Sequence, residues 1–310
     1  MNKTDIKHVI GKLVADKEME YRLSEKIVEK QHNKVSFKRI ASIAASFVMI
    51  ICLGITGYVF WEKKPDPSPQ SITSPDGIYL PKIELPKKTN AAMDMIGLIM
   101  YQGRIYTQTG TKVNPESAEK LLGEKLGTTK GNIDEWSRQD DYAVEFASSI
   151  GKQDVYSVKG YDKNFRIMTY EKTNGVTYAE FYECFNGITV KSGADVFDKL
   201  KIENRITAVK YENFDSWNYT KQQYKELQQL QLVNSFVNEL KNTVPYDQKD
   251  LSYLWNDKDE TNRKFVYLTL NDGTEVQLRL FKEGYIYYDC SHIFFKMENI
   301  AFNNLWNVLK

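Results

Sequence analysis

Residues 264–281 read KFVYLTLNDGTEVQLRLF, two runs rich in Val, Leu, Phe and Tyr that are joined by Asn271-Asp272-Gly273. Runs of this composition on either side of an Asp-Gly turn are typical of a β-hairpin. A second turn, Lys282-Glu283-Gly284, leads into two more strand-like runs, Tyr285–Cys290 and Ile293–Met297. The sequence therefore predicts an antiparallel meander over residues 264–297.

The same pattern recurs toward the N-terminus and alternates with helical segments. Further strands are expected at Ile96–Thr107 (a hairpin broken at Gln102-Gly103), Asp154–Val158, Phe165–Tyr170 and Val176–Cys184, the last two joined by Thr173-Asn174-Gly175. Apolar periodicity and capping residues predict helices at Asn114–Leu122, Ala194–Leu200, Lys221–Lys241 and Glu298–Leu309. The fold class is therefore α+β, with antiparallel sheets and packed helices.

A weak internal similarity links two parts of this region. The segment Phe181–Cys184 and the later Phe197–Leu200 resemble Tyr287–Cys290 and Phe302–Leu305, at a spacing of about 105 residues. Duplication of an αβ unit explains this similarity, and so does the general likeness of any meander followed by an amphipathic helix. Both explanations stay open.

Upstream of these elements lies the longest uncharged stretch of the chain, Ile40–Trp61, IASIAASFVMIICLGITGYVFW. About 20 apolar residues in a helix cross a hydrocarbon layer of about 30 Å, and the aromatic residues at its C-terminal end suit the headgroup layer. Six basic residues precede it between Arg22 and Arg39, whereas only Lys63 and Lys64 follow it closely. We expect an uncleaved signal-anchor with a cytoplasmic N-terminus and an extracellular C-terminal domain in the cell membrane.

Composition divides the rest of the chain. Six of the eight prolines lie between Pro65 and Pro86, which favours an extended stalk. The expected domains are a cytoplasmic tail (1–39), a transmembrane helix (40–61), a proline-rich stalk (62–90) and two extracytoplasmic α+β units (91–215 and 216–310). Residues 1–39 carry ten basic and six acidic residues, whereas residues 65–310 carry 30 basic and 34 acidic ones. A mildly acidic outer region argues against nucleic acid as its partner.

The tail carries an apolar stripe. Ile6, Val9, Ile10 and Leu13 recur at helical spacing behind the capping residues Thr4-Asp5, and charged residues fill the remaining faces. A segment this short has no core of its own, so the stripe must be covered by the membrane surface, by another copy or by a partner's groove. We expect these four residues to bind a cytoplasmic regulatory protein.

Residues that carry chemistry are scarce after the stalk. Cys184 and Cys290 leave two states open, a disulfide or two separate buried thiols. Together with His292 they lack the paired spacing of a zinc site, and Asp257–Thr261 lacks the glycine and closing carboxylate of a calcium loop. We therefore expect no metal and no cofactor.

Catalytic motifs are equally weak. Ser117-Ala-Glu-Lys120, Lys191-Ser-Gly193 and Ser216-Trp-Asn218 imitate the three motifs of penicillin-recognising serine enzymes, but the last two stand in the wrong order. The acidic segment Asp134–Asp141 is typical of a solvated loop rather than of a carboxylate pair for glycoside cleavage. We therefore assign no catalytic residues and do not expect an enzyme.

The layout of the first 90 residues resembles that of single-pass membrane regulators of low-GC Gram-positive bacteria, including membrane-bound anti-sigma factors. The resemblance rests on the helical tail with Leu23-Ser-Glu-Lys-Ile-Val-Glu-Lys30, the basic Lys38-Arg39, the span and the proline stalk. The HxxxCxxC motif of zinc-type anti-sigma factors is absent, because no cysteine lies near His8 or His32. The resemblance implies only that the tail binds a sigma factor.

These observations favour a membrane-anchored extracytoplasmic sensing or binding protein whose tail binds a regulator such as a sigma factor. Its expected partners are the lipid bilayer, a cytoplasmic regulatory protein and an unidentified extracellular ligand. The alternative is a cell-envelope binding module or an unrecognised hydrolase that works outside the cell and uses the span only as an anchor.

Overall fold

A computed structural model describes residues 77–83, 96–134, 137, 139–255 and 259–310. The expected tail stripe Ile6, Val9, Ile10 and Leu13, the expected span Ile40–Trp61 and most of the stalk lie outside the described residues. Within the described ranges, every helix is too short or too polar to span a membrane. The C-terminal body, from Lys64 onward, forms one compact unit.

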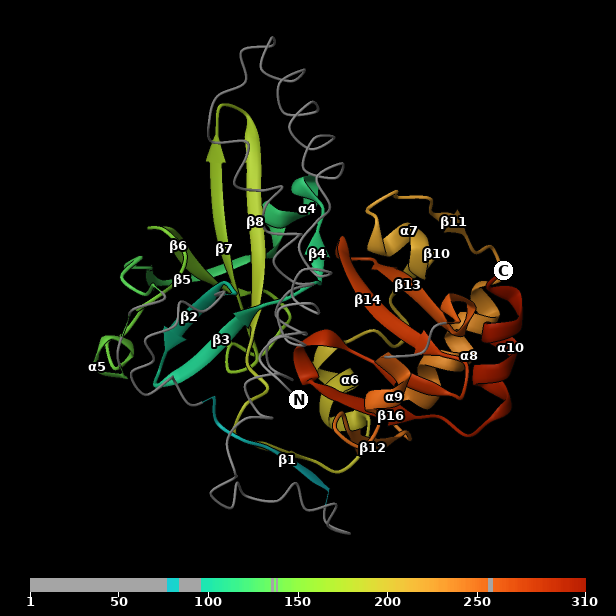
Figure 1. Ribbon diagram of the computed structural model, residues 1–310. Coiled ribbons are helices and arrows are strands. Elements are labelled where there is room, and N and C mark those ends of the chain that lie inside the picture. The colour runs from blue at the N-terminus through green and yellow to red at the C-terminus, as the bar shows by residue number, and fades with distance from the viewer. Residues whose placement is uncertain (1–76, 84–95, 135–136, 138, 256–258) are drawn as a thin grey trace, which may run out of the picture. The chain divides into compact units, whose positions relative to one another are not determined.

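The first sheet is antiparallel and has the strand order β2-β3-β8-β7-β6-β5 among the described residues (Figure 1). Its strands are β2 (Leu98–Tyr101), β3 (Arg104–Gln108), β5 (Leu122–Thr128), β6 (Asp154–Val158), β7 (Arg166–Thr173) and β8 (Val176–Glu183). The predicted hairpins at 96–107 and 165–184 are confirmed. Asn174 and Gly175 at the second turn both have positive φ, as a tight hairpin turn requires.

The second sheet contains the predicted meander and is also antiparallel, in the order β11-β10-β13-β14-β15-β16-β12, with β4 added beside β14. Its strands are β4 (Lys112–Val113), β10 (Ile206–Asn213), β11 (Lys225–Glu226), β12 (Val244–Asp247), β13 (Arg263–Leu270), β14 (Thr274–Phe281), β15 (Tyr285–Tyr287) and β16 (Ile293–Lys296). The meander of residues 264–297 is confirmed, except that Asp289–Ser291 forms the short 3-10 helix η3. Strand β12 ends the sheet on one side and its proline, Pro245, suits an edge position.

A separate pair of strands joins the start of the described chain to its middle. Strand β1 (Ile78–Leu80) pairs in antiparallel fashion with β9 (Ile188–Val190). Ile78 and Leu80 are buried, whereas Tyr79 between them is 58% exposed. The alternation shows that this short strand lies with one face on the core.

The helices are short and lie between or after the strands. They are α4 (Pro115–Leu121), α5 (Gln139–Tyr142), α6 (Ala194–Leu200), α7 (Phe214–Asn218), α8 (Leu230–Leu240), α9 (Ser252–Trp255) and α10 (Ile300–Val308), with the 3-10 helix η2 at Glu260–Asn262. The predicted α4, α6 and α10 are confirmed; Asn114 caps α4 at the predicted start, and Asn299 caps α10, which begins at Ile300. The class is thus α+β with antiparallel sheets.

One predicted helix is wrong over half of its length. The apolar stripe of Lys221–Lys241 predicted a single helix, but α8 begins only at Leu230. Thr220 and Gln222 have positive φ, and Lys225–Glu226 pairs with β10 instead. Tyr224 packs edge-on against Tyr267, so pairing and packing with the second sheet override the local helical periodicity.

The main core fills one face of the second sheet. Helices α8 and α10 lie side by side against it (Figure 1), with the rings of Phe236 and Phe302 6.3 Å apart. Helix α6 joins them, because Phe197 packs on Phe295 of β16 at 4.8 Å. The core also includes Phe181 of β8, so both sheets contribute to it. A smaller aromatic cluster around Trp255 covers the opposite face of the second sheet.

The two segments that look alike in sequence have different neighbours. Strand β9, before α6, pairs with β1 outside the main sheets. Strand β16, before α10, pairs with β15 and β12 inside the second sheet. Duplication of an αβ unit and the general likeness of such segments both stay open as explanations.

Candidate functional site

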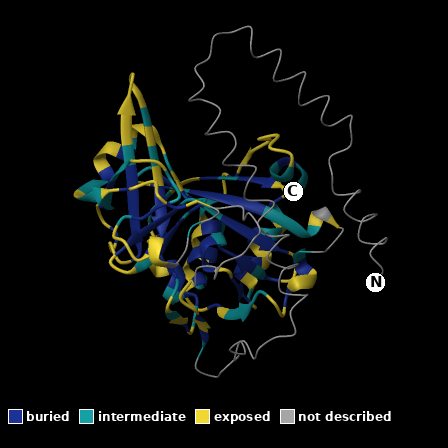
Figure 2. Ribbon diagram, turned by 60° about the vertical axis from the view of Figure 1, so that its left-hand side comes forward, coloured by how far each residue is buried: buried dark blue, intermediate teal, exposed yellow. Residues whose placement is uncertain are grey.

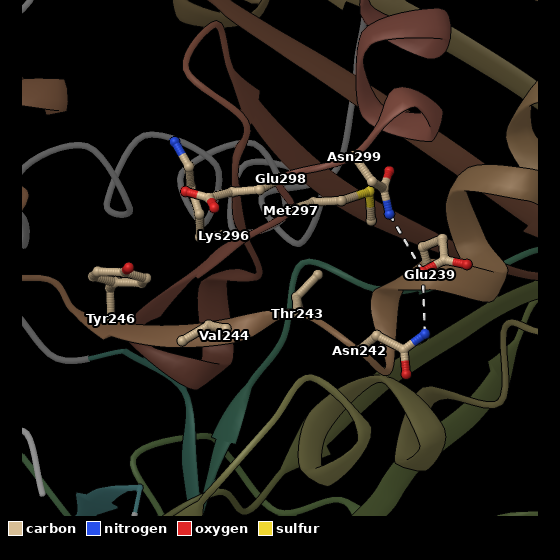
Figure 3. Close-up of a pocket in the computed structure, with 9 residues that line it drawn as sticks. All are labelled: Glu239, Asn242, Thr243, Val244, Tyr246, Lys296, Met297, Glu298 and Asn299. Carbon is tan, nitrogen blue, oxygen red and sulfur yellow. Dashed lines mark hydrogen bonds between the residues drawn. The ribbon is translucent and has the colours of Figure 1, made fainter. Parts of the chain in front are cut away.

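A pocket lies where α8 ends, α10 begins and the edge strand β12 runs beside β16. It has a volume of about 260 Å³ and is here called the Glu239 pocket. Its lining residues, shown in Figure 3, are Glu239, Asn242, Thr243, Val244, Tyr246, Lys296, Met297, Glu298 and Asn299. The pocket is therefore built from two segments, 239–246 and 296–299, that meet only in the folded chain.

Glu239 organises one end of the pocket. Its Oε2 accepts hydrogen bonds from Asn242 Nδ2 at 3.1 Å and from Asn299 Nδ2 at 3.3 Å. Asn299 also caps α10, because its Oδ1 accepts from the backbone N–H of Ala301 at 2.9 Å. The Glu239 carboxylate thus joins the last turn of α8 to the first turn of α10 (Figure 3).

The other end of the pocket combines a ring with charged groups. Tyr246 is half-buried on β12, and Figure 3 shows Lys296 and Glu298 on the same side of the pocket. The Lys296 ammonium donates to the Glu283 carbonyl oxygen and lies 4.2 Å from the centre of the Tyr285 ring, so other groups already engage its charge. Two carboxylates and two amides therefore dominate the polar lining, beside the apolar Met297.

A second polar cluster is buried between the sheets. Arg166 of β7 and Glu183 of β8 are each fully buried, and Arg166 donates to Glu183 Oε1 through Nε at 2.9 Å and through Nη2 at 2.6 Å. Tyr288, beyond the end of β15, donates to Glu183 Oε2 at 2.6 Å. Thr109 and Thr111 lie 3.1 Å and 2.9 Å from the same tyrosine hydroxyl. The cluster thus joins the first sheet to the C-terminal half of the chain.

The buried ion pair and hydrogen bonds of this cluster hold the first sheet and the C-terminal half of the chain together. Burial lowers the pKa of Arg166, but the charge of Glu183 outweighs burial and holds that pKa above the ordinary value, so Arg166 stays charged. Burial and the same carboxylate raise the pKa of Tyr288 well above its ordinary value. The guanidinium also lies 4.3 Å from the centre of the Tyr161 ring. Arg166 therefore keeps its charge and Tyr288 keeps its hydroxyl proton at neutral pH.

The two cysteines after the stalk are buried free thiols in this structure, the second of the two states that the sequence left open. Cys184 belongs to a small cluster with Tyr106 and Tyr182, whereas Cys290 belongs to the main core. Burial raises the pKa of both thiols, so both are protonated at neutral pH and react slowly.

Two of the weak catalytic motifs, those at Ser117 and Ser216, contribute no residue to the lining of the Glu239 pocket. Ser117 and Lys120 lie on α4, and neither they nor His292 line the pocket. The buried Ser216 hydroxyl donates to Glu212 Oε2 at 2.5 Å and accepts from the Gln223 backbone N–H at 2.9 Å. These two bonds tie the Ser216 hydroxyl to β10 and to the loop before β11.

Sequence reasoning missed the Glu239 pocket. Its single local signal was the asparagine that begins the final helix, Asn299, next to Glu298. Nothing in the local pattern links Asn299 to Glu239, 60 residues earlier.

Metal ions find no ready site in the part of the chain that the structure describes, where no three His, Cys, Asp or Glu side chains gather closely enough. The acidic residues Asp140 and Asp141 lie exposed on α5. Comparison of the chain with protein-family models, with curated proteins and with solved structures gives no match.

Proposed function

We propose that this protein is a membrane-anchored extracytoplasmic sensor. In this proposal the Glu239 pocket receives a small polar ligand, the segment 40–61 crosses the membrane, and the tail stripe Ile6, Val9, Ile10 and Leu13 binds a cytoplasmic regulator such as a sigma factor. The observation that carries the proposal is the pocket itself, a hollow of about 260 Å³ with a ring at one side and paired amide and carboxylate groups at the other.

The charges of the pocket indicate the chemistry of its ligand. Glu239 and Glu298 bring two negative charges, while the single lysine, Lys296, is already engaged by a carbonyl and a ring. Carboxylates accept hydrogen bonds from ammonium and hydroxyl groups, and the Tyr246 ring offers an apolar face. A ligand with an organic ammonium group therefore fits better than an anion.

The tail is tested with substitutions on its apolar stripe. Ile10→Asp combined with Leu13→Asp places two charges in the stripe and should abolish co-purification of a cytoplasmic partner with the full-length protein from membranes. The same variant should change the transcripts that the partner controls. The matched control is His8→Asp, which adds a charge on the opposite face of a helix with this periodicity and should leave both readouts unchanged.

The alternative is an envelope protein that works wholly outside the cell. It predicts that Ile10→Asp with Leu13→Asp leaves every transcript unchanged and that no cytoplasmic partner is recovered with the native chain. That combination of results would remove the regulatory part of the proposal.

The pocket is tested with its carboxylates. Glu239→Ala and Glu298→Ala should each alter the same transcripts as the tail variant, because both remove a negative charge from the proposed ligand site. The control is Glu119→Ala, an exposed carboxylate on α4 that pairs weakly with Lys172 at 3.6 Å. Equal transcript levels in all three variants would exclude the pocket as the sensing site.

A further inference from the structure

Strand β1 lies within the segment expected to be the proline-rich stalk (62–90) and is the first described element of the chain, so it is the first part of the described chain that comes after the expected span. Its pairing with β9 consists of three register pairs, Ile78 with Val190, Tyr79 with Thr189 and Leu80 with Ile188. This pairing is here called the β1 clasp. Among the described strands β1 has no second neighbour, so these pairs and the burial of Ile78 and Leu80 hold it in place.

Backbone hydrogen bonds connect the clasp to the Glu239 pocket. The chain leaves β9 at Val190, and the Gly193 N–H then donates to the Thr243 carbonyl oxygen at 2.9 Å. The next N–H, that of Ala194, donates to the Lys241 carbonyl oxygen at 3.1 Å. Thr243 lines the pocket, so three residues separate the clasp from its wall.

The backbone at Gly193 is packed closely against the turn 240–243. A Cβ atom at Gly193 would overlap the carbonyl oxygen of Leu240 and the hydroxyl of Thr243, so only glycine allows the two backbones to lie this close. Asp195 fixes the approach from the other side, because its Oδ2 accepts from the N–H groups of Lys191 at 2.7 Å and Ser192 at 3.1 Å. A shift of the turn 240–243 must therefore move the end of β9.

Glu239 controls that turn from within the pocket. Its carboxylate accepts from Asn242 in the turn and from Asn299 at the start of α10. Both amides donate to the same oxygen, Oε2, so a ligand that donates to Oε2 competes with them for it. Occupancy of the pocket thus changes what holds residues 240–243.

We propose that the β1 clasp is a releasable switch, whose pairing with β9 is set by the state of the Glu239 pocket. It passes a change in the pocket to the segment that leads toward the membrane. The inference rests on the proposed function, in which this pocket receives the ligand, and describes how binding there would be transmitted as a shift in the population of released β1.

Hydrogen exchange on the full-length protein in lipid nanodiscs tests the coupling. Glu239→Ala removes the acceptor of both amides and should speed exchange of the amides of Ile78–Leu80 at least fivefold. Glu119→Ala is the control and should leave them unchanged. If Glu239→Ala speeds exchange in residues 240–243 but leaves Ile78–Leu80 at the native rate, the inference is wrong.

A cross-link tests the same coupling in reverse. Tyr79 and Thr189 lie opposite each other and both are exposed, so Tyr79→Cys with Thr189→Cys can close a disulfide over the clasp without disturbing the core. Coupling between two sites is reciprocal, so oxidation should slow exchange in residues 240–243 relative to the reduced form. Equal exchange in the two forms would contradict the inference.

Substitutions at Gly193 and Asp195, which connect β9 to the turn 240–243, test whether the coupling runs through this segment. Gly193→Ala should abolish the effect of the cross-link on residues 240–243, and Asp195→Asn, which keeps the core intact, should reduce it at least twofold. An undiminished effect in Asp195→Asn would show that the coupling does not run through this segment. None of these readouts needs a ligand or a cytoplasmic partner, so the clasp can fail while the tail experiment succeeds, and the reverse.

Discussion

Arg166 and Glu183 form a fully buried ion pair, and the second carboxylate oxygen is used by Tyr288. Removing one charge of a buried ion pair destabilises the fold strongly, because the remaining charge then has neither water nor an opposite charge beside it. Both charges are hydrogen-bonded here, although Nη1 of the arginine is buried without a protein partner. The cluster is therefore sensitive to loss of a single charge.

Glu183→Gln should lower the free energy of unfolding by about 3–5 kcal/mol, the usual cost of breaking a buried pair. Tyr288→Phe should cost about 1–3 kcal/mol, since it leaves one carboxylate oxygen short of a donor. Urea unfolding of the full chain in detergent measures both. Glu119→Gln, which loosens only an exposed pair with Lys172, should cost less than about 1 kcal/mol. A Glu183→Gln variant as stable as this control would contradict the role of the pair.

Asp272 contributes to the stability of the fold in a pH-dependent way. Burial raises its pKa, but hydrogen bonds from Thr274 and the Arg205 guanidinium, 2.5 Å away, outweigh burial and hold the pKa below the ordinary value. A carboxylate with a lowered folded-state pKa stabilises the fold above its unfolded pKa of about 3.9, and this stability is lost as the pH falls through the folded value.

Asp272→Asn should therefore be less stable than the native chain by a constant amount between pH 6 and pH 7, and the difference should shrink below about pH 4. Chemical unfolding at several pH values measures this difference. The exposed Asp198, replaced by Asn, serves as the control. A gap between Asp272→Asn and the native chain that stays constant down to pH 3 would exclude this linkage.

At the scale of elements, β7 and β8 continue beyond their neighbours. Strand β6 pairs with β7 only as far as Thr169, and β3 pairs with β8 only near Tyr182. Residues 170–179 pair only with each other, and Figure 2 shows the end of this hairpin exposed. Val176 and Tyr178 there are 45% and 49% exposed. A two-stranded ribbon of this kind is marginal without further support.

Gly175→Ala should loosen this ribbon locally. Gly175 has φ +77°, a conformation that costs an alanine about 1–2 kcal/mol. Proteolysis within residues 170–179 should become faster, while the urea midpoint of the whole domain stays the same because the ribbon end adds little to the core. Gly151→Ala is the control, since nothing lies near its Cβ position and it lacks positive φ. A drop in the global midpoint would show that the ribbon belongs to the main folding unit.

In the β1 clasp, the free energy gained by side-chain burial is close to the entropy cost of ordering the backbone. Burying Ile78 and Leu80 contributes about 3–6 kcal/mol in total, at about 1.5–3 kcal/mol for each side chain. Ordering the backbone of three residues costs about 3–6 kcal/mol, at about 1–2 kcal/mol each. The two contributions nearly cancel, which makes β1 easier to release than the long strands β13 and β14.

At the scale of the whole molecule, residues 64–310 form a unit of their own. Its core joins both sheets and the helices α6, α8 and α10. A chain that begins at Lys64 should therefore unfold cooperatively, with the same urea midpoint and the same m-value as the C-terminal body of the full-length protein. Tyrosine and tryptophan fluorescence measures both. A smaller m-value in the short chain would show that residues before Lys64 complete the core.

Local patterns in the sequence determined the hairpins, the C-terminal meander, the helices α4, α6 and α10, and thus the α+β class. Alternating apolar residues and Asn-Gly or Asp-Gly turns act over a few positions, so they can be interpreted without knowing the rest of the chain. The tail, the span and the stalk are predicted from the same kind of local pattern.

Only the tertiary structure decided where the remaining segments go. Residues 225–226 are not helical, because they pair with β10 as a strand. Strand β1 pairs with β9, which lies more than 100 residues later in the chain. The Glu239 pocket forms only where the start of α10 meets the end of α8, where Asn299 donates a hydrogen bond to Glu239. Contacts of this kind depend on how far-apart segments pack together, and local periodicity contains no information about that packing.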